Sequence, residues 1–285
     1  MKHLIDAYSP SEMAQRVVRI GVAKGKLPAA DSLILSMLAG SFIGLGAAFA
    51  TLTTTSPEMG FGPAKILGGV SFSLGLILVV VAGAELFTGN NLVAMAWASR
   101  LITTRQVLRN WTLVYLGNFV GSVGTAVLVY YSGTWALGGH GVGANALAIA
   151  AAKCDLTWVE AFFRGILCNA LVCLAVWLSQ SARSTTDKIL AIIWPITAFV
   201  AMGFEHCIAN MYFIPLGILL KGNPEIMTVL GQAPASMDGL GWGGMVGNLV
   251  PVTLGNIVGG TLMVAGVYWF AYLRNEEKKA LLGTD

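Results

Sequence analysis

The sequence predicts an all-α membrane protein whose six transmembrane helices form two inverted three-helix repeats, with helices 2 and 5 broken. The first observation is composition: only 11% of the 285 residues are charged and the mean hydropathy is +0.73, whereas soluble domains carry about 25% charged residues. The second is a series of long apolar stretches, and the third is a pair of short motifs that each occur twice. A chain with so few charges belongs in lipid.

Six apolar stretches follow one another along the chain. They cover residues 32–57, 66–99, 110–129, 159–181, 189–220 and a segment within 239–273. Each is long enough to span a bilayer, which takes about 20 residues. We therefore expect a transmembrane domain over 32–273, preceded by an N-terminal segment (1–31) and followed by a C-terminal tail (274–285).

Lysine and arginine are distributed unevenly between the connecting segments. With the N-terminus inside, 13 of the 17 fall on inner segments, as the positive-inside rule requires. Both termini should therefore be cytoplasmic, and the first span should itself direct insertion because no cleavable signal peptide is visible. The net charge of +3 is too small to indicate a nucleic-acid partner.

The N-terminal segment predicts a short amphipathic helix. Residues 9–12 read Ser-Pro-Ser-Glu, which fits a capping box with proline at the first helical position. Met13, Val17 and Ile20 then fall on one face. We expect this helix to lie on the inner membrane surface as an anchor, with a gating role as the alternative.

An internal repeat is the most informative feature of the sequence. Residues 83–90 and 203–210 both fit G-x-E-x4-N, and residues 117–121 and 255–259 both fit G-N-x-V-G. The repeats extend over about 32–131 and 157–273. Because each holds three spans, the second copy must enter the membrane from the opposite side, and such folds place the solute path near the midplane between interrupted helices.

Glu85 and Glu205 each lie inside an apolar span. A carboxylate facing lipid there would cost several kcal/mol, so both must face protein or water. We expect each, with Asn90 or Asn210 of the same motif, to brace a broken helix, the carboxylate accepting backbone N–H groups that lose their partners at the break. A direct role in proton relay is the alternative.

His206 is the only histidine inside a predicted span, and its counterpart in the other repeat is Leu86. The symmetry therefore predicts one protonatable group among apolar residues, and histidine changes charge near physiological pH. Thr88 follows the first break and can offer a hydroxyl to a passing anion. The alternative for Thr88 is a threonine that only satisfies a helix end.

Two rival functions are weaker. A water or glycerol pore would carry paired Asn-Pro-Ala motifs, but the nearest string is Asn-Pro-Glu at 223–225. A membrane-embedded enzyme is a rival of another class, but the G-x-G-x-x-G string at 239–244 lacks a βαβ context; it reads as a flexible lead into the last span. The four cysteines form no CxxC pair, and we expect neither a metal nor a cofactor.

Two long strings then resemble a known family. Residues 80–89 (VVAGAELFTG) and 165–175 (GILCNALVCLA) are similar to the two signatures of the formate/nitrite transporter family, and the chain looks closest to its formate-channel branch. The resemblance implies an aquaporin-like protomer with its own pore, assembled as a homopentamer in lipid. We expect a multi-pass protein of the bacterial inner (plasma) membrane.

The resemblance also implies roles for individual residues. Leu76, Leu86 and Thr88 would line a cytoplasmic slit, Phe72, Phe199 and Asn169 a periplasmic slit, His206 would lie between the slits, and Lys153 would stand at the outer entrance. Lys153 is expected in the outer loop just before the fourth span, where a cation would raise the local concentration of anions.

The function that follows is a transporter or anion channel for small monovalent anions of weak acids, formate above all, with proton-linked passage. Moving a bare carboxylate into an apolar slit costs tens of kcal/mol by idealised Born solvation, whereas protonating it at neutral pH costs roughly 4 kcal/mol. We expect Lys153 to gather the anion, and His206, with Thr88 and Asn169, to hold or relay the proton. Nitrite and hydrosulfide are the alternative solutes, and the two phenylalanine rings argue against larger acids such as lactate.

Overall fold

The structure is a computed structural model that describes residues 7–55, 58–231 and 237–274. Every regular element within these ranges is helical: α1 (Pro10–Lys26), α2 (Ala29–Thr53), α3 (Phe61–Ala82), η1 (Gly89–Val93), α4 (Ala94–Ala98), α5 (Thr104–Ser132), η2 (Thr134–Ala136), α6 (Gly141–Cys154), α7 (Trp158–Ser179), α8 (Thr185–Ala201), α9 (Cys207–Leu220), α10 (Pro224–Leu230), α11 (Trp242–Val258), η4 (Gly259–Gly266) and α12 (Val267–Tyr272). Except for Arg274, the predicted tail lies outside the described residues, as do the first six residues of the N-terminal segment.

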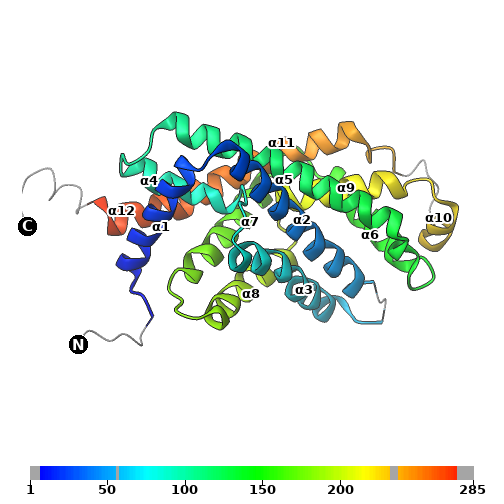
Figure 1. Cartoon of the computed structure of the whole chain (residues 1–285). Helices are drawn as coiled ribbons and strands as arrows, with labels where there is room; N and C mark the ends of the chain where they lie inside the picture. Colours follow the sequence, from blue (N-terminus) through cyan, green and yellow to red (C-terminus); the bar gives the residue numbers. More distant parts are fainter. Residues whose placement is uncertain (1–6, 56–57, 232–236, 275–285) are drawn as a thin grey trace, which may run out of the picture.

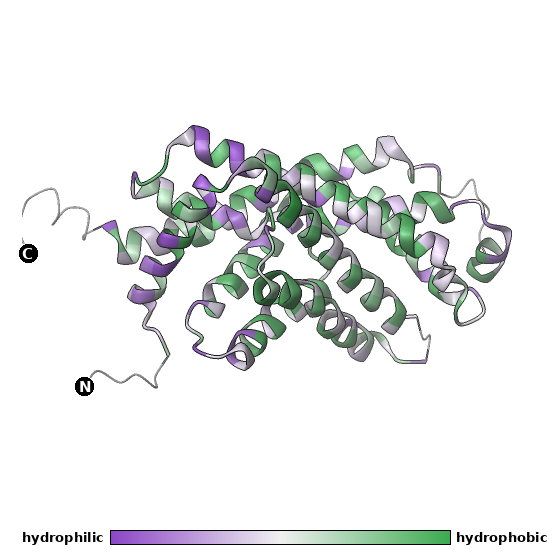
Figure 2. Cartoon of the chain, viewed as in Figure 1, coloured by the Kyte–Doolittle hydropathy of each residue, from purple (hydrophilic) through white to green (hydrophobic). Residues whose placement is uncertain are grey.

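Five helices are long and apolar enough to cross a membrane: α2, α3, α5, α7 and the continuous rod from α11 to α12. The fifth predicted span is divided between α8 and α9, which have 17 and 14 residues. Apolar residues cover most of these helices, and hydrophilic ones gather on α1 and the connecting segments (Figure 2). The helices α1 and α12 lie at one end of the bundle and α10 at the other (Figure 1).

The helix breaks predicted in spans two and five are present. Helix α3 ends at Gly83, whose φ of 84° lies in the left-handed region, and the chain resumes as η1 only at Gly89. Helix α8 ends before Gly203, with a φ of 69°, and α9 begins at Cys207. Glycine adopts these angles without the steric penalty that a Cβ would add, so each G-x-E motif ends its helix.

Each repeat is preceded by a helix of its own. Helix α1 comes before α2, and α6, which the sequence analysis did not predict, comes before α7. Lys153 lies in the last turn of α6, so its predicted location in a loop is wrong. Helix α6 is rich in alanine, the best helix former, but its 14 residues are too few to be recognised as a span.

Helix α1 begins with the predicted capping box, in which the Ser9 side chain accepts the Glu12 N–H and Glu12 accepts the Ser9 N–H at 2.8 Å. Its buried face includes Met13 and Val17, which pack in one cluster with residues of η1, α4 and α7. The protein itself therefore covers Met13 and Val17, two of the three residues of the predicted face, because η1 and α4 pack against them. Ile20, the third, stays 38% exposed, and its contact with the membrane surface stays a prediction.

Candidate functional site

Two cavities open on either side of the helix breaks. Helix α3 connects them, because its first turns up to Phe72 line one cavity and its last turns from Leu76 line the other. We name them the Glu85 vestibule, about 390 Å³ in volume, and the Glu205 vestibule, about 410 Å³. The first is lined by α1, α3, η1 and the facing ends of α7 and α8, and the second by α2, α3, α6, α7, α8 and α9.

The wall between the vestibules is apolar. Leu76 and Leu86, 1% and 2% exposed, line the Glu85 vestibule, and Phe72 and Phe199, each 3% exposed, line the Glu205 vestibule. The two phenylalanine rings meet edge to face with their centroids 5.5 Å apart. Four of the predicted slit residues thus occupy opposite sides of one barrier, where no charge would be stabilised, whereas Thr88 and Asn169 line neither vestibule.

The two breaks meet at a single polar contact. Thr88 follows the first break and His206 the second, and Thr88 Oγ1 lies 2.8 Å from His206 Nε2. The other ring nitrogen, Nδ1, accepts the backbone N–H of Ala209 at 3.1 Å. Because a neutral imidazole has one N–H, this cap leaves the proton on Nε2, which donates it to the threonine hydroxyl. Both side chains are buried, Thr88 completely.

Asn169 is fully buried and lies beside the first break. Its Nδ2 is within hydrogen-bonding distance of three acceptors: the Thr88 carbonyl at 3.3 Å, Asn91 Oδ1 at 2.8 Å and the Asn256 carbonyl at 2.7 Å. It lines neither vestibule. Asn169 therefore contacts the backbone of Thr88 and not His206. The side-chain group that bonds the Nε2 of His206 is the Thr88 hydroxyl.

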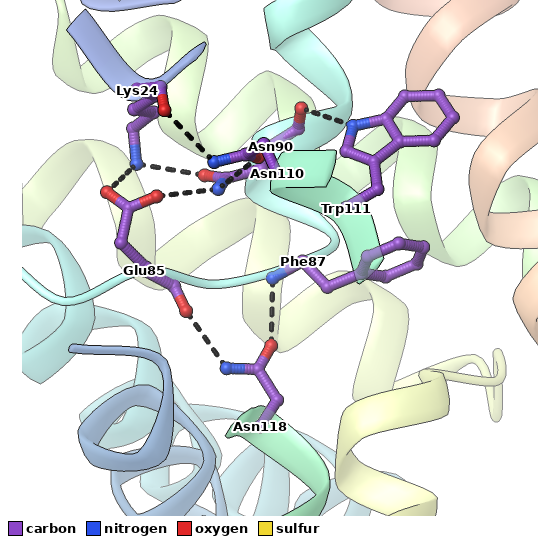
Figure 3. A network of polar contacts seen from close by, with 7 residues as sticks. All are labelled: Lys24, Glu85, Phe87, Asn90, Asn110, Trp111 and Asn118. Atoms are coloured by element: carbon purple, nitrogen blue, oxygen red, sulfur yellow. Dashed lines mark hydrogen bonds and ion pairs between the residues drawn. The ribbon is translucent and has the colours of Figure 1, made fainter. Parts of the chain in front are cut away.

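A polar network holds the first break from the side of α1 (Figure 3). Lys24 Nζ lies 2.6 Å from Glu85 Oε1 and 2.9 Å from Asn90 Oδ1, and Asn90 Nδ2 donates to Glu85 Oε2 at 2.7 Å. Asn90 also donates to Asn110 Oδ1 at 3.0 Å, and Asn110 donates to the Lys24 carbonyl at 3.3 Å. The buried carboxylate is thus paired and hydrogen-bonded, as a charge at this depth requires.

The second break repeats this network with residues of α6. Lys153 Nζ lies 2.9 Å from Glu205 Oε1, and Asn210 donates to Glu205 Oε2 at 2.7 Å and to Asn248 at 2.7 Å. Asn248 donates to the Lys153 carbonyl at 2.8 Å. The networks differ in one bond: Asn90 Oδ1 accepts the Lys24 ammonium group, whereas Asn210 Oδ1 is buried without a partner among the residues that the structure describes.

The backbone at each break is held by an asparagine of the G-N-x-V-G motif. Asn118 accepts the Phe87 N–H at 2.9 Å and donates to the Glu85 carbonyl at 2.9 Å. Asn256 likewise accepts the Cys207 N–H at 2.9 Å and donates to the Glu205 carbonyl at 2.9 Å. Our prediction that the glutamate carboxylates accept these backbone N–H groups is therefore wrong. Each carboxylate pairs with a lysine and an asparagine, and the amides of Asn118 and Asn256, from the neighbouring helices α5 and α11, fix the backbone.

Five participants were not among the predicted site residues: Lys24, Asn110, Asn118, Asn248 and Asn256, although Asn118 and Asn256 belong to the repeated G-N-x-V-G motif. A signal for them exists, because asparagines eight positions apart recur as 110 and 118 and as 248 and 256. Lys24 and Lys153 also lie 11 residues before Leu35 and Arg164, whose carbonyls accept the N–H groups of Glu85 and Glu205. Helices α1 and α6 are therefore equivalent, and the repeats begin earlier than the predicted residues 32 and 157.

The described residues contain no group of three or more His, Cys, Asp or Glu side chains that could hold a metal ion. Cys168, Cys173 and Cys207 are fully buried, and all four cysteines are free. The polar groups buried around the breaks include two ion pairs, the asparagines hydrogen-bonded to them and to the backbone, and the pair formed by Thr88 and His206.

Comparison with known proteins agrees with this geometry. The profile described as "Formate/nitrite transporter" matches residues 11–270. The chain belongs to the formate/nitrite transporter family. The formate channel FocA of Escherichia coli (strain K12) is 43% identical over 276 residues, which cover 95% of this chain and 97% of that relative. FocA of Haemophilus influenzae is 45% identical, with 83% of this chain and 84% of the relative covered.

Solved structures of the family have the same fold. A pentameric formate channel with formate bound superimposes with a TM-score of 0.81 at 44% identity, covering 86% of this chain and 98% of that one. An ion channel of the family superimposes with a TM-score of 0.78 at 29% identity, covering 91% and 98%. The predicted family and the all-helical fold of two broken repeats are confirmed.

Proposed function

We propose that this protein carries small monovalent anions of weak acids, formate above all, across the membrane, and that passage is linked to a proton. The similar proteins that carry formate in their names support the solute. The observation that carries the mechanism is the Thr88–His206 bond of 2.8 Å, which joins a histidine in the lining of the Glu205 vestibule to a fully buried threonine beside the apolar wall. A solute crossing that wall has a hydroxyl and a ring N–H within reach.

Energetics decide in which form the solute crosses. A bare carboxylate among Phe72, Leu76, Leu86 and Phe199 would lose its hydration, at an idealised cost of tens of kcal/mol. Formic acid, with a carboxyl pKa of about 4, forms from formate at neutral pH for roughly 4 kcal/mol. The neutral form is therefore far cheaper to move, and flux should rise as the pH falls, because the neutral fraction grows tenfold per pH unit.

The histidine takes part through its Nε2–H. That group and the Thr88 hydroxyl can donate hydrogen bonds to a carboxylate that enters from the Glu205 vestibule, which His206 lines. The proton relay predicted for His206 carries a condition: the ring must take a second proton on Nδ1, which requires the bond from the Ala209 N–H to break. We therefore propose that His206 first holds the solute by hydrogen bonding, and relays a proton only when its helix cap opens.

The orientation and assembly belong to the same proposal. Helices α1 and α12 lie at the end of the bundle where the Glu85 vestibule opens (Figure 1), so the distribution of lysine and arginine assigns this end to the cytoplasm. We propose a homopentamer in the bacterial inner membrane. Lipid and neighbouring protomers would cover exposed apolar side chains such as Leu128 (72% exposed) and Leu262 (64%).

Flux into proteoliposomes tests the function. Uptake of formate, nitrite, hydrosulfide and lactate is compared at several pH values, for the wild type and for His206→Asn and His206→Phe. We expect formate to move faster than lactate, with uptake increasing as the pH falls. Faster movement of nitrite or hydrosulfide would reassign the solute, and chemical turnover of a solute without a gradient would indicate an enzyme instead.

The two histidine variants separate positioning from relay. Asparagine does not titrate, but its side-chain oxygen can still cap α9. Phenylalanine neither titrates nor caps the helix. The growing neutral fraction of the solute makes uptake depend on pH in every variant. If the ring relays the proton, the pH dependence in both variants differs from that of the wild type. A pH dependence that is unchanged in both variants would contradict the relay.

A further inference from the structure

Three cationic side chains line the Glu205 vestibule: Lys65 of α3, Lys153 of α6 and Arg164 of α7. Lys153, to which the sequence analysis assigned the gathering of anions, is held by the protein. Its Nζ lies 2.9 Å from Glu205 Oε1, and its side chain is only 14% exposed. A carboxylate at this distance offsets most of the field of the ammonium group, so Lys153 presents little net charge to an approaching solute.

Lys65 and Arg164 are not neutralised in this way. Among the residues that the structure describes, no carboxylate oxygen lies within 4 Å of Lys65 Nζ, whose aromatic contact is Phe61 at 5.6 Å. Arg164 has Glu160 at 3.8 Å, with the two side chains 42% and 49% exposed. Exposed pairs of this kind contribute little, and the Glu160 carboxylate already accepts the N–H and hydroxyl of Thr157.

We propose that Lys65 and Arg164 form an anion-collecting site at the mouth of the Glu205 vestibule, built for a small carboxylate or an anion of similar shape. This inference rests on the proposed function. The Arg164 carbonyl accepts the Glu205 N–H at 3.3 Å, which fixes the arginine backbone beside the helix break. Its planar guanidinium can donate two parallel hydrogen bonds to a carboxylate, and Lys65 adds a second positive charge.

The site belongs to one side of the protein only. The residue equivalent to Arg164 in the first repeat is Leu35, which accepts the Glu85 N–H at 3.2 Å and carries no charge. The Glu85 vestibule is lined by two cations that do not pair with Glu85, Arg16 and Lys188. Neither is the repeat equivalent of Lys65 or Arg164. Removing Lys65 and Arg164 should therefore affect anions that arrive from the Glu205 side and spare those from the other.

Thiol reactivity measures the local field without any transport. In a Cys154→Ser background, Ala152→Cys places one thiol in the lining of the Glu205 vestibule, and the remaining cysteines are fully buried. The rate with an anionic methanethiosulfonate reagent is divided by the rate with a cationic one. We expect Lys65→Gln and Arg164→Gln each to lower this ratio by about fivefold, because a unit charge about 8 Å away in water would change each of the two rates by about 2.4-fold and in opposite directions. High salt should reduce the difference.

Two controls give the result its meaning. Lys188→Gln removes a cation from the opposite vestibule, and the pair Lys153→Met with Glu205→Gln removes one charge of each sign from the same vestibule. Neither should change the rate ratio by more than about twofold. An unchanged ratio in Lys65→Gln and Arg164→Gln, or an equal change in Lys188→Gln, would overturn the proposal.

Flux then links the site to transport. With formate supplied from the Glu205 side, the variant lacking both cations should need about five times more formate for half-maximal uptake, with the same maximal rate; from the opposite side it should match the wild type. Equal losses from both sides would count against the site. If the wild type moves no formate, the proposed function fails, and the thiol rates still decide whether the site collects anions.

Discussion

The two helix breaks share their polar networks but differ in how the chain continues after them. After the first break, Leu86 occupies the position that His206 occupies after the second, and the chain forms the 3-10 helix η1 and the five-residue α4. After the second break, His206 caps α9 by accepting the Ala209 N–H, and α9 runs for 14 residues. A side-chain acceptor at this position stabilises a regular helix start, and leucine provides none.

The comparison separates the fold from the site. A lysine, a glutamate and three asparagines recur in equivalent positions at both breaks, so they serve the architecture that the repeats share. The pair Thr88 and His206 has no such duplicate, because the equivalent residues are Ile208 and Leu86. The chemistry of the wall between the vestibules lies where the symmetry is broken.

The largest effects are expected from removing one member of an ion pair. Lys24→Met and Lys153→Met each leave a buried carboxylate without its counter-ion, which typically costs about 3–5 kcal/mol. Lys24→Met should be worse by about 1 kcal/mol, because Lys24 also donates to Asn90 whereas Lys153 does not donate to Asn210. Thermal unfolding in detergent measures both.

The matched control for these variants is the pair of changes Lys24→Met with Glu85→Gln, which removes both charges. It should recover most of the stability that the single change loses. A double variant no more stable than Lys24→Met would show that the ion pair is not the reason for the loss.

Intermediate effects are expected where backbones touch in both halves. A Cβ on Gly121 would overlap the Met37 carbonyl, and one on Gly259 would overlap the Ile166 carbonyl. Alanine at either position should destabilise the protein by about 1–3 kcal/mol or more, as overpacking does. Gly124→Ala is the control, since a Cβ there meets nothing within 4 Å; loss of stability in Gly124→Ala of the same size would refute the steric explanation.

The smallest effect tests the cap that distinguishes the breaks. His206→Leu, which makes the second break resemble the first, removes the acceptor for the Ala209 N–H and should cost about 1 kcal/mol. His206→Asn retains an acceptor and should cost less. Hydrogen exchange of the amides at the start of α9 should increase in the leucine variant only; equal exchange in both variants would exclude the capping role.

The breaks and the inverted repeats could be predicted because each leaves a local signature: a glutamate inside an apolar run, a glycine two positions before it, and a motif that recurs. The contact between Lys24 and Glu85 could not be predicted, because the two residues lie 61 positions apart. No local sequence pattern links the amphipathic helix α1 to a carboxylate buried in another segment. Helix α6 escaped notice because it is shorter than a span. The tautomer of His206 depends on an N–H three residues later, and only a folded backbone brings that group to the ring.

The fixed tautomer has an energetic consequence for the cell. A proton moves along a chain of hydrogen-bonded groups only if each member can receive it on one side while releasing it on the other. Because Nδ1 accepts the Ala209 N–H, the imidazole has no free lone pair to receive a proton from hydronium. A chain of proton transfers would therefore stop at this ring. The passage would thus let a protonated acid through without short-circuiting the electrochemical gradient on which the membrane's ATP synthesis depends.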